Sequence, residues 1–184
     1  MTAMVTMPPA TTERCRLLLQ RWRQDLRLTR REQGLLRGEL TLLDRQLQRL
    51  EHNVLRLAVF GRVGVGKSSL INALVGQRLL ETDVAHGSTR RQQAVTWPLK
   101  LDGLQRVELI DTPGIDEIDA AGRTRLATRV AMGVDLVLLV IDSDLTRCDR
   151  DALETLQASG KPVRLVLNRS DRWPEDQLPE LLAS

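Results

Sequence analysis

The sequence predicts an α/β fold, in which a mostly parallel sheet carries helices on both faces and is preceded by a helical segment. Two observations support this. From residue 54 onward, short aliphatic runs typical of strands alternate with helical patterns, as in sheets built from crossover connections. Before that point, apolar residues recur in steps of three and four, as on one side of a helix. We therefore expect a disordered N-terminus over residues 1–10, a helical segment over 11–53 and an α/β domain over 54–184.

The helical segment has two readings. A stripe of apolar or small residues runs from Cys15 through Trp22 and Leu26 to Leu50, with breaks in its spacing near the middle. Gly34 and Gly38 each weaken a helix by about 1 kcal/mol relative to alanine. Two short antiparallel helices and one long coiled-coil helix are therefore both allowed.

Basic charge is concentrated at the N-terminus. The eleven arginines and six acids of residues 1–58 give a net charge of +5, whereas the remainder of the chain carries −2. These Arg-rich helices suit RNA, the ribosome or an anionic membrane surface as a partner. The alternative is a solvated outer face, because acids are interspersed with the arginines.

Other features of composition limit the class of protein. Cys15 and Cys148 are isolated thiols, which suit a reducing cytosol and provide neither a disulfide framework nor a zinc site. No apolar run approaches the ~20 residues needed to span a bilayer. We expect a cytoplasmic protein without a transmembrane segment, whose contact with a membrane, if it has one, is peripheral.

A glycine-rich loop connects the first predicted strand to the first helix of the sheet. It matches the pattern G-x-x-x-x-G-K-[ST] in the strand–loop–helix setting that this pattern requires. Glycines let backbone N–H groups surround an anionic oxygen, and the helix adds its unpaired N–H groups. Lys67 can reach the outer phosphates of a nucleotide, and the Ser68 hydroxyl suits Mg²⁺. The predicted phosphate-binding residues are Gly61, Arg62, Val63, Gly64, Val65, Gly66, Lys67, Ser68 and Ser69.

The remaining elements follow in order. Helices are predicted over residues 67–76, 123–132 and 149–158, and another begins at 177. Strands are predicted over 54–60, 92–99, 104–111, 134–142 and 162–168. The last two strands read as buried, and Pro98 places the second at a sheet edge. Ligands of such sheets lie at the carboxyl ends of the strands, where the polar motifs also fall.

Two of these motifs concern the metal and the outer phosphate. Asp111 ends a strand, as expected of the carboxylate that holds Mg²⁺, and Thr112, Pro113 and Gly114 follow it. Gly114 lies where a γ-phosphate can recruit the backbone. Thr89 lies in a loop from which its hydroxyl can move onto the metal when a triphosphate is bound. We predict Ser68, Thr89 and Asp111 as metal ligands, and Lys67 and Thr89 as catalytic residues.

A third motif, Asn168-Arg169-Ser170-Asp171, follows the last predicted strand. The Asp171 carboxylate can accept hydrogen bonds from both N1–H and the exocyclic amine of guanine. Adenine has no such pair of donors, so it would leave buried polar groups unpaired. We predict that Asn168, Arg169 and Asp171 select guanine.

The ordered set GRVGVGKS, Thr89, DTPG and NRSD resembles the translation-factor class of GTPases, and GKSSLINAL, GSTR and DTPGI resemble the Era/TrmE group of bacterial GTPases. The resemblance covers residues 54–184 and implies the three-layer P-loop GTPase fold, with GTP or GDP and Mg²⁺ as ligands. It also implies slow GTP hydrolysis coupled to a conformational switch.

The sequence departs from this family's pattern in four places. Arg169 replaces the usual lysine. Gly64 offers no side-chain oxygen for potassium, and Ile115 stands where Ras-like enzymes have a water-orienting glutamine. The chain also stops before the family's last strand and helix, so we expect an incomplete domain with weak cover over the strand at 162–168.

The sequence-based hypothesis is therefore a GTP-binding protein that hydrolyses GTP to GDP and phosphate as a switch. One alternative is a dynamin-like membrane-associated GTPase. Another is an interaction module that binds nucleotide without hydrolysing it.

Overall fold

A computed structural model describes residues 9–81 and 92–173 of the 184-residue chain. The described chain divides into two compact units. The first contains the residues up to Leu55 together with Lys100–Arg106, and the second contains Arg56–Leu99 and the residues from Val107 onward. Thr89 and the helix predicted from residue 177 lie outside the described residues.

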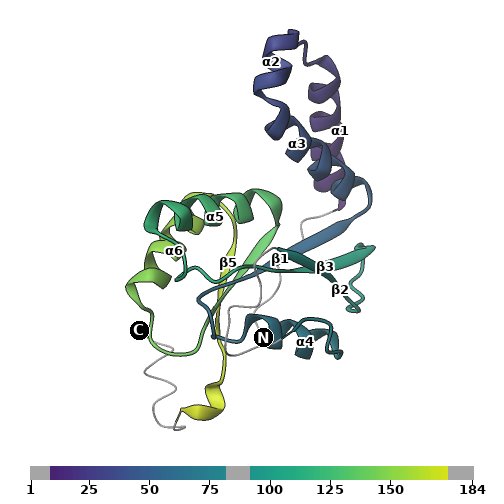
Figure 1. The fold of residues 1–184 in the computed structure, drawn as a ribbon. Helices are drawn as coiled ribbons and strands as arrows, with labels where there is room; N and C mark the ends of the chain where they lie inside the picture. Colours follow the sequence, from purple (N-terminus) through teal and green to yellow (C-terminus); the bar gives the residue numbers. More distant parts are fainter. Residues whose placement is uncertain (1–8, 82–91, 174–184) are drawn as a thin grey trace. The chain divides into compact units, whose positions relative to one another are not determined.

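The first unit is built from helices α1 (Pro9–Asp25), α2 (Arg30–Leu35) and α3 (Arg37–Glu51). Helices α1 and α3 pack side by side (Figure 1), so the segment is a hairpin and not one long helix. The helix is interrupted before Gly34, between Asp25 and Arg30. There the Thr29 hydroxyl accepts from the Glu32 N–H, and the Glu32 carboxylate accepts from the Thr29 N–H. This capping box starts α2. Helix α1 begins at Pro9, so its first two residues fall in the stretch predicted to be disordered.

A five-stranded sheet forms the main part of the second unit. Its strands are β1 (Val54–Phe60), β2 (Gln93–Trp97), β3 (Arg106–Asp111), β4 (Leu136–Ile141) and β5 (Val163–Leu167). They lie in the order β2-β3-β1-β4-β5, with β1, β4 and β5 parallel and β2 antiparallel to β3. No helix covers residues 98–105, which join the antiparallel pair, and β2 lies at the edge that Pro98 predicts.

Helices cover both faces of this sheet. Helix α4 (Lys67–Val75) lies on one face, and α5 (Ala120–Gly133) and α6 (Arg147–Ala158) lie on the other (Figure 1). The core beneath α5 and α6 is aliphatic apart from one phenylalanine, Phe60 of β1, which packs with residues such as Leu139 and Leu156. Helix α6 begins two residues before its predicted start, because Thr146 caps it in a second capping box with Asp149.

Strand β5 differs from its prediction as a buried strand. It pairs with β4 and is the last strand of the sheet among the described residues. Arg164 is exposed, and half of the Leu165 side chain is exposed. The prediction of a buried strand, made from its aliphatic composition, is therefore wrong for these residues. Burial also depends on which elements lie beside the strand.

Candidate functional site

The glycine-rich loop leads from β1 into α4 in a conformation that only glycine adopts readily. Gly64 and Gly66 have φ angles of 79° and 89°, and Gly66 is the N-cap residue directly before α4. A Cβ at Gly66 would lie 2.3 Å from Nδ2 of Asn168, and one at Gly61 would lie 2.4 Å from the carbonyl oxygen of Val140. The loop therefore presents backbone with no side chain at these two positions, as a phosphate cradle requires.

Lys67 is buried at the start of α4, with 7% of its surface exposed. Its Nζ donates to the carbonyl oxygen of Arg62 at 2.7 Å, so the side chain folds back along the loop. Burial lowers the pKa of Lys67, and the charges of Asp111, Asp116 and Glu117 oppose this shift. A buried cation whose pKa is lowered by desolvation would gain a countercharge from a phosphate in the loop.

Ser68 and Asp111 meet at the carboxyl end of the sheet. The Ser68 hydroxyl, in the first turn of α4, donates to Oδ2 of Asp111 at 2.7 Å, and Asp111 ends β3 with 1% of its surface exposed. The sequence separates these residues by 43 positions, and the fold brings their oxygens into contact. A hydroxyl and a carboxylate are hard oxygen donors of the kind Mg²⁺ prefers, so this pair fits the predicted metal site.

The segment after Asp111 packs against the glycine-rich loop. The Thr112 hydroxyl is buried and donates to the carbonyl oxygen of Val59 at 2.8 Å, so this side chain ties β3 to β1. A Cβ at Gly114 would lie 2.1 Å from Cγ2 of Val63, and the Ile115 N–H donates to the carbonyl oxygen of Gly61 at 3.4 Å. Only glycine at position 114 allows this close approach. Pro113, between Thr112 and Gly114, is half-buried.

Asp116 is a site residue that the sequence analysis missed. Its Oδ1 accepts a hydrogen bond from the Val63 N–H at 2.7 Å. A backbone amide of the glycine-rich loop is thus occupied by a carboxylate supplied from the segment after Asp111. The only signal in the sequence is an acid directly after DTPGI.

The guanine motif lies beside the same loop. After β5, the Asn168 N–H donates to the carbonyl oxygen of Ile141 at 2.7 Å, and its Nδ2 donates to that of Val65 at 2.8 Å. Arg169 follows in the left-handed conformation, with φ at 56°. Asp171 lies in the short helix η1 (Ser170–Arg172), where it is exposed. Asn168 therefore links the two predicted binding motifs.

Two arginines of the predicted site share one carboxylate. Nη2 of Arg62 lies 3.4 Å from Oδ1 of Asp142, and Nη1 of Arg169 donates to Oδ2 at 2.9 Å. Nε of Arg62 also lies 3.1 Å from the fully buried carboxylate of Asp149, which caps α6. The Arg62 side chain is therefore directed toward β4 and α6. Arg62 would contact a phosphate through its backbone N–H and not through its side chain.

The sequence analysis did not single out Asp142 or Asp149. Their signals are an acid at the carboxyl end of β4 and the T-x-x-D pattern of a capping box. Of the other predicted residues, Val65 is buried beneath the loop, whereas Gly64 and Ser69 are exposed.

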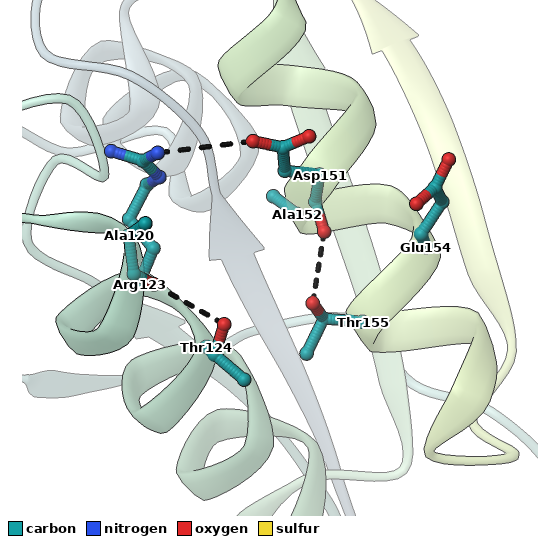
Figure 2. Close-up of a pocket in the computed structure, with 7 residues that line it drawn as sticks. All are labelled: Ala120, Arg123, Thr124, Asp151, Ala152, Glu154 and Thr155. Carbon is teal, nitrogen blue, oxygen red and sulfur yellow. Dashed lines mark hydrogen bonds and ion pairs between the residues drawn. The ribbon is translucent and has the colours of Figure 1, made fainter.

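A separate cavity of about 250 Å³ lies between α5 and α6, and Figure 2 shows its lining. Its lining residues are Ala120, Arg123, Thr124, Asp151, Ala152, Glu154 and Thr155. Arg123 points toward Asp151, with 3.8 Å between Nη2 and Oδ2, and the Thr155 hydroxyl donates to the Asp151 carbonyl oxygen at 2.9 Å. Of the predicted site residues that the structure describes, none lines this cavity.

Among residues 9–81 and 92–173, no helix has the length and apolar character needed to cross a bilayer.

Comparisons with known proteins support the predicted family. Residues 56–169, more than half of the chain, match the family model described as 50S ribosome-binding GTPase. The chain is 43% identical to GTPase Der of Rhizobium johnstonii over 126 residues, which are 65% of this chain and 26% of the relative. It is 38% identical to GTPase Era of Synechocystis sp. over 135 residues, which are 70% of this chain and 41% of the relative.

Solved structures show the same fold. A crystal structure of Era in complex with MgGDPNP and nucleotides 1506–1542 of 16S ribosomal RNA superimposes with a TM-score of 0.60 at 25% identity, over 71% of this chain and 46% of that one. Toc33 from Arabidopsis thaliana in complex with GDP and Mg²⁺ superimposes with a TM-score of 0.51 at 22% identity, over 76% of this chain and 62% of that one. The chain thus spans well under half of the length of the curated relatives.

Proposed function

The chain belongs to the 50S ribosome-binding GTPase family, and we propose that its second unit binds a guanine nucleotide with Mg²⁺ and hydrolyses GTP to GDP and phosphate as a nucleotide-dependent switch. The observation that carries this proposal is the meeting of three separate motifs at one end of the sheet. The Ser68 hydroxyl contacts the Asp111 carboxylate, and Asn168 donates to the loop carbonyl of Val65.

Each motif has a task in this proposal. The backbone N–H groups from Gly61 to Ser69 bind the phosphates, and Lys67 neutralises the charge that develops on the outer phosphates. Ser68, Asp111 and Thr89 would hold Mg²⁺, which supplies electrophilic stabilisation of the phosphoryl group. Asn168 and Arg169 contact the guanine base, and the Asp171 carboxylate accepts hydrogen bonds from its N1–H and exocyclic amine.

Hydrolysis requires a water molecule to attack the γ-phosphorus in line with the departing GDP. Ile115 stands where Ras-like enzymes orient this water with glutamine, and its side chain is fully buried. The site therefore offers no polar side chain at that position, and we expect slow turnover. The alternative, a module that binds nucleotide without hydrolysing it, predicts no turnover.

The proposal is tested by nucleotide binding and turnover. GTP should compete at least ~100-fold better than ATP, because a site with paired hydrogen bonds rejects the misfit strongly. Asp171→Asn should weaken GTP binding and improve binding of xanthosine triphosphate, whose additional carbonyl needs a donor. Lys67→Ala should abolish turnover. Equal competition by ATP and GTP would contradict the guanine assignment, and binding without any phosphate release would leave the non-hydrolysing module.

For the partner we propose a polyanionic surface in the cytoplasm, either RNA or an anionic membrane, contacted through the Arg-rich helices α1–α3. The net charge of +5 over residues 1–58 supports this class, since the remainder of the chain is slightly acidic. Binding to such a surface should weaken steeply as salt is raised.

A further inference from the structure

The helical hairpin displays its large apolar side chains on the outside. Of the ten exposed large hydrophobic side chains among the described residues, six lie between Leu17 and Leu36. Leu18 and Trp22 are exposed by 59% and 53%, and Leu35 by 74%. Single exposed leucines are ordinary on protein surfaces, but a concentration of them in one short region indicates an interaction surface.

On α1 four side chains form one stripe, and the exposed Leu17 lies outside it. Cys15, Leu18, Leu19 and Trp22 follow the spacing i, i+3, i+4 and i+7, which places them on one side of a helix, and all four are exposed. We call these four residues the outer stripe.

Polar residues occupy the other side of α1, which packs toward α3. Arg16, Gln20 and Arg23 are half-buried there. Gln20 donates to Glu51, and Arg23 donates twice to Asp44, at 2.8 and 3.2 Å. The contact between the two helices is thus made partly by polar pairs, while the apolar side of α1 faces solvent.

Positive charge flanks the outer stripe. Arg14 and Arg21 are exposed, and at 100° per residue they lie on the flank next to Leu18. Exposed arginines continue in the turn, on α2 and at the start of α3, at positions 27, 30, 31 and 37. Three of the nearby acids are engaged: Glu13 pairs with Arg16, Asp44 with Arg23, and Glu32 caps α2. Asp25, at the end of α1, is exposed and offsets part of this positive charge.

Resting on the polyanionic partner proposed above, we infer that the outer stripe and its flanking arginines form a docking surface for an anionic lipid membrane. Leucine and tryptophan side chains enter the boundary between headgroups and acyl chains, while arginines at their flank contact the phosphates. A second copy of this chain would bring like charges together, and RNA phosphates would gain nothing from exposed leucines. The combination of apolar and basic groups on one helix therefore favours lipid.

The test is flotation of the full chain with vesicles of phosphatidylcholine, with and without 30% phosphatidylglycerol. Binding to the anionic vesicles should weaken several-fold between low and physiological salt, because the charge contribution is screened. Leu18→Ser should reduce the partition coefficient by about ten-fold, since it removes one apolar side chain from the bilayer boundary. Arg14→Gln with Arg21→Gln should reduce it by about five-fold for each charge.

Matched variants outside the surface serve as controls. Leu79→Ser changes a leucine that is 54% exposed, and Arg125→Gln with Arg129→Gln changes two exposed arginines of α5. These should leave flotation unchanged, and all the variants should keep the nucleotide affinity and helical content of the parent protein. Equal losses in the control and stripe variants would overturn the proposal, as would binding that depends only on total charge.

Thiol labelling locates the contact directly. Cys15 belongs to the outer stripe, whereas Cys148 is half-buried and burial raises its pKa, which slows its reaction with maleimide. Anionic vesicles should slow labelling of Cys15 at least ~five-fold and leave Cys148 unchanged. Protection of Cys15 by protein concentration alone would identify self-association, and protection by RNA but not by vesicles would identify a nucleic-acid surface. Either result would overturn the lipid assignment.

Discussion

The phosphate-loop region and the helical hairpin differ in which side chains they bury. Around the loop, polar side chains are buried and paired: Asp149 and Thr112 are fully buried, and Lys67 nearly so. In α1, the polar residues Gln20 and Arg23 pair with α3, and the apolar residues Leu18 and Trp22 face solvent. Around the loop the buried side chains are packed and hydrogen-bonded, as in a protein interior. In α1 the polar side chains make the helix contact, and the apolar ones are exposed.

This difference indicates where each region obtains its stability and its function. Buried, hydrogen-bonded side chains hold the loop in one geometry, as a site that binds by preorganised backbone requires. The hairpin has one buried side chain in α3, Leu47, and none in α2. Regions with few buried apolar contacts open locally at low free energy. We therefore expect substitutions to affect the loop strongly and the hairpin weakly.

The largest effect is expected at Gly66. Gly66→Ala forces a Cβ to within 2.3 Å of Asn168 Nδ2 at a φ of 89°, so the bond from Asn168 to Val65 has to break. We expect GTP affinity to fall on the order of 100-fold, or about 3 kcal/mol. Isothermal titration of the purified variant measures this loss.

Gly64→Ala is the matched control for that experiment. Gly64 also has a positive φ, 79°, but a Cβ there would meet nothing within 4 Å. It should therefore show only the backbone strain, which is about 1–2 kcal/mol of stability. If both variants lost GTP affinity equally, Asn168 would not be the cause.

A middle-sized effect is expected at Asp142. Asp142→Asn removes the negative charge shared by Arg62 and Arg169, so both guanidinium groups lose a charge-assisted partner. GTP affinity should fall by about ten-fold, whereas binding of tripolyphosphate, which lacks the base held by Arg169, should change less. Asp144→Asn, at an exposed neighbour, should change neither. Equal losses for both ligands would place the role of Asp142 in folding alone.

The smallest effect is expected in the hairpin, at Asp44. Hydrogen bonding by Arg23 lowers the pKa of Asp44 below its usual 3.8. The pair therefore stabilises the folded chain above the aspartate's ordinary pKa, and this contribution is lost as the pH falls through the lowered value. Because the two side chains are 33% and 49% exposed, solvent screens the pair.

Asp44→Asn should therefore lower the melting temperature by about 2 °C or less at neutral pH, and by less once the pH falls through the lowered pKa of Asp44. Thermal melts followed by circular dichroism at neutral pH and in acid measure this. A drop several times larger at neutral pH would contradict the expectation that substitutions affect the hairpin weakly.

The sequence predicted the elements of the sheet well, because strand and helix periods are local and the loop pattern is specific. It predicted helix starts less well, as at Arg147 and Ala120, where the caps Thr146 and Asp119 lie before the apolar pattern. It could not predict Asp116 or Asp142, because their partners in the phosphate loop lie 53 and 80 positions away in the chain. Such contacts depend on tertiary packing, which the periodicity of the sequence does not encode. The exposure of β5 likewise depends on its place in the sheet.

The hydrogen bond from Val63 to Asp116 means that the site carries its own anion. A carboxylate tethered beside the loop acts as an internal competitor, at an effective concentration in the ~millimolar range. A single phosphate that displaces the Asp116 carboxylate gains one contact with the loop while the carboxylate loses one. A nucleotide that contacts several loop amides gains several contacts for the same loss. We therefore expect the segment after Asp111 to select incoming ligands by the number of contacts they make with the loop. We also expect it to slow their entry, because the Asp116 carboxylate has to leave first.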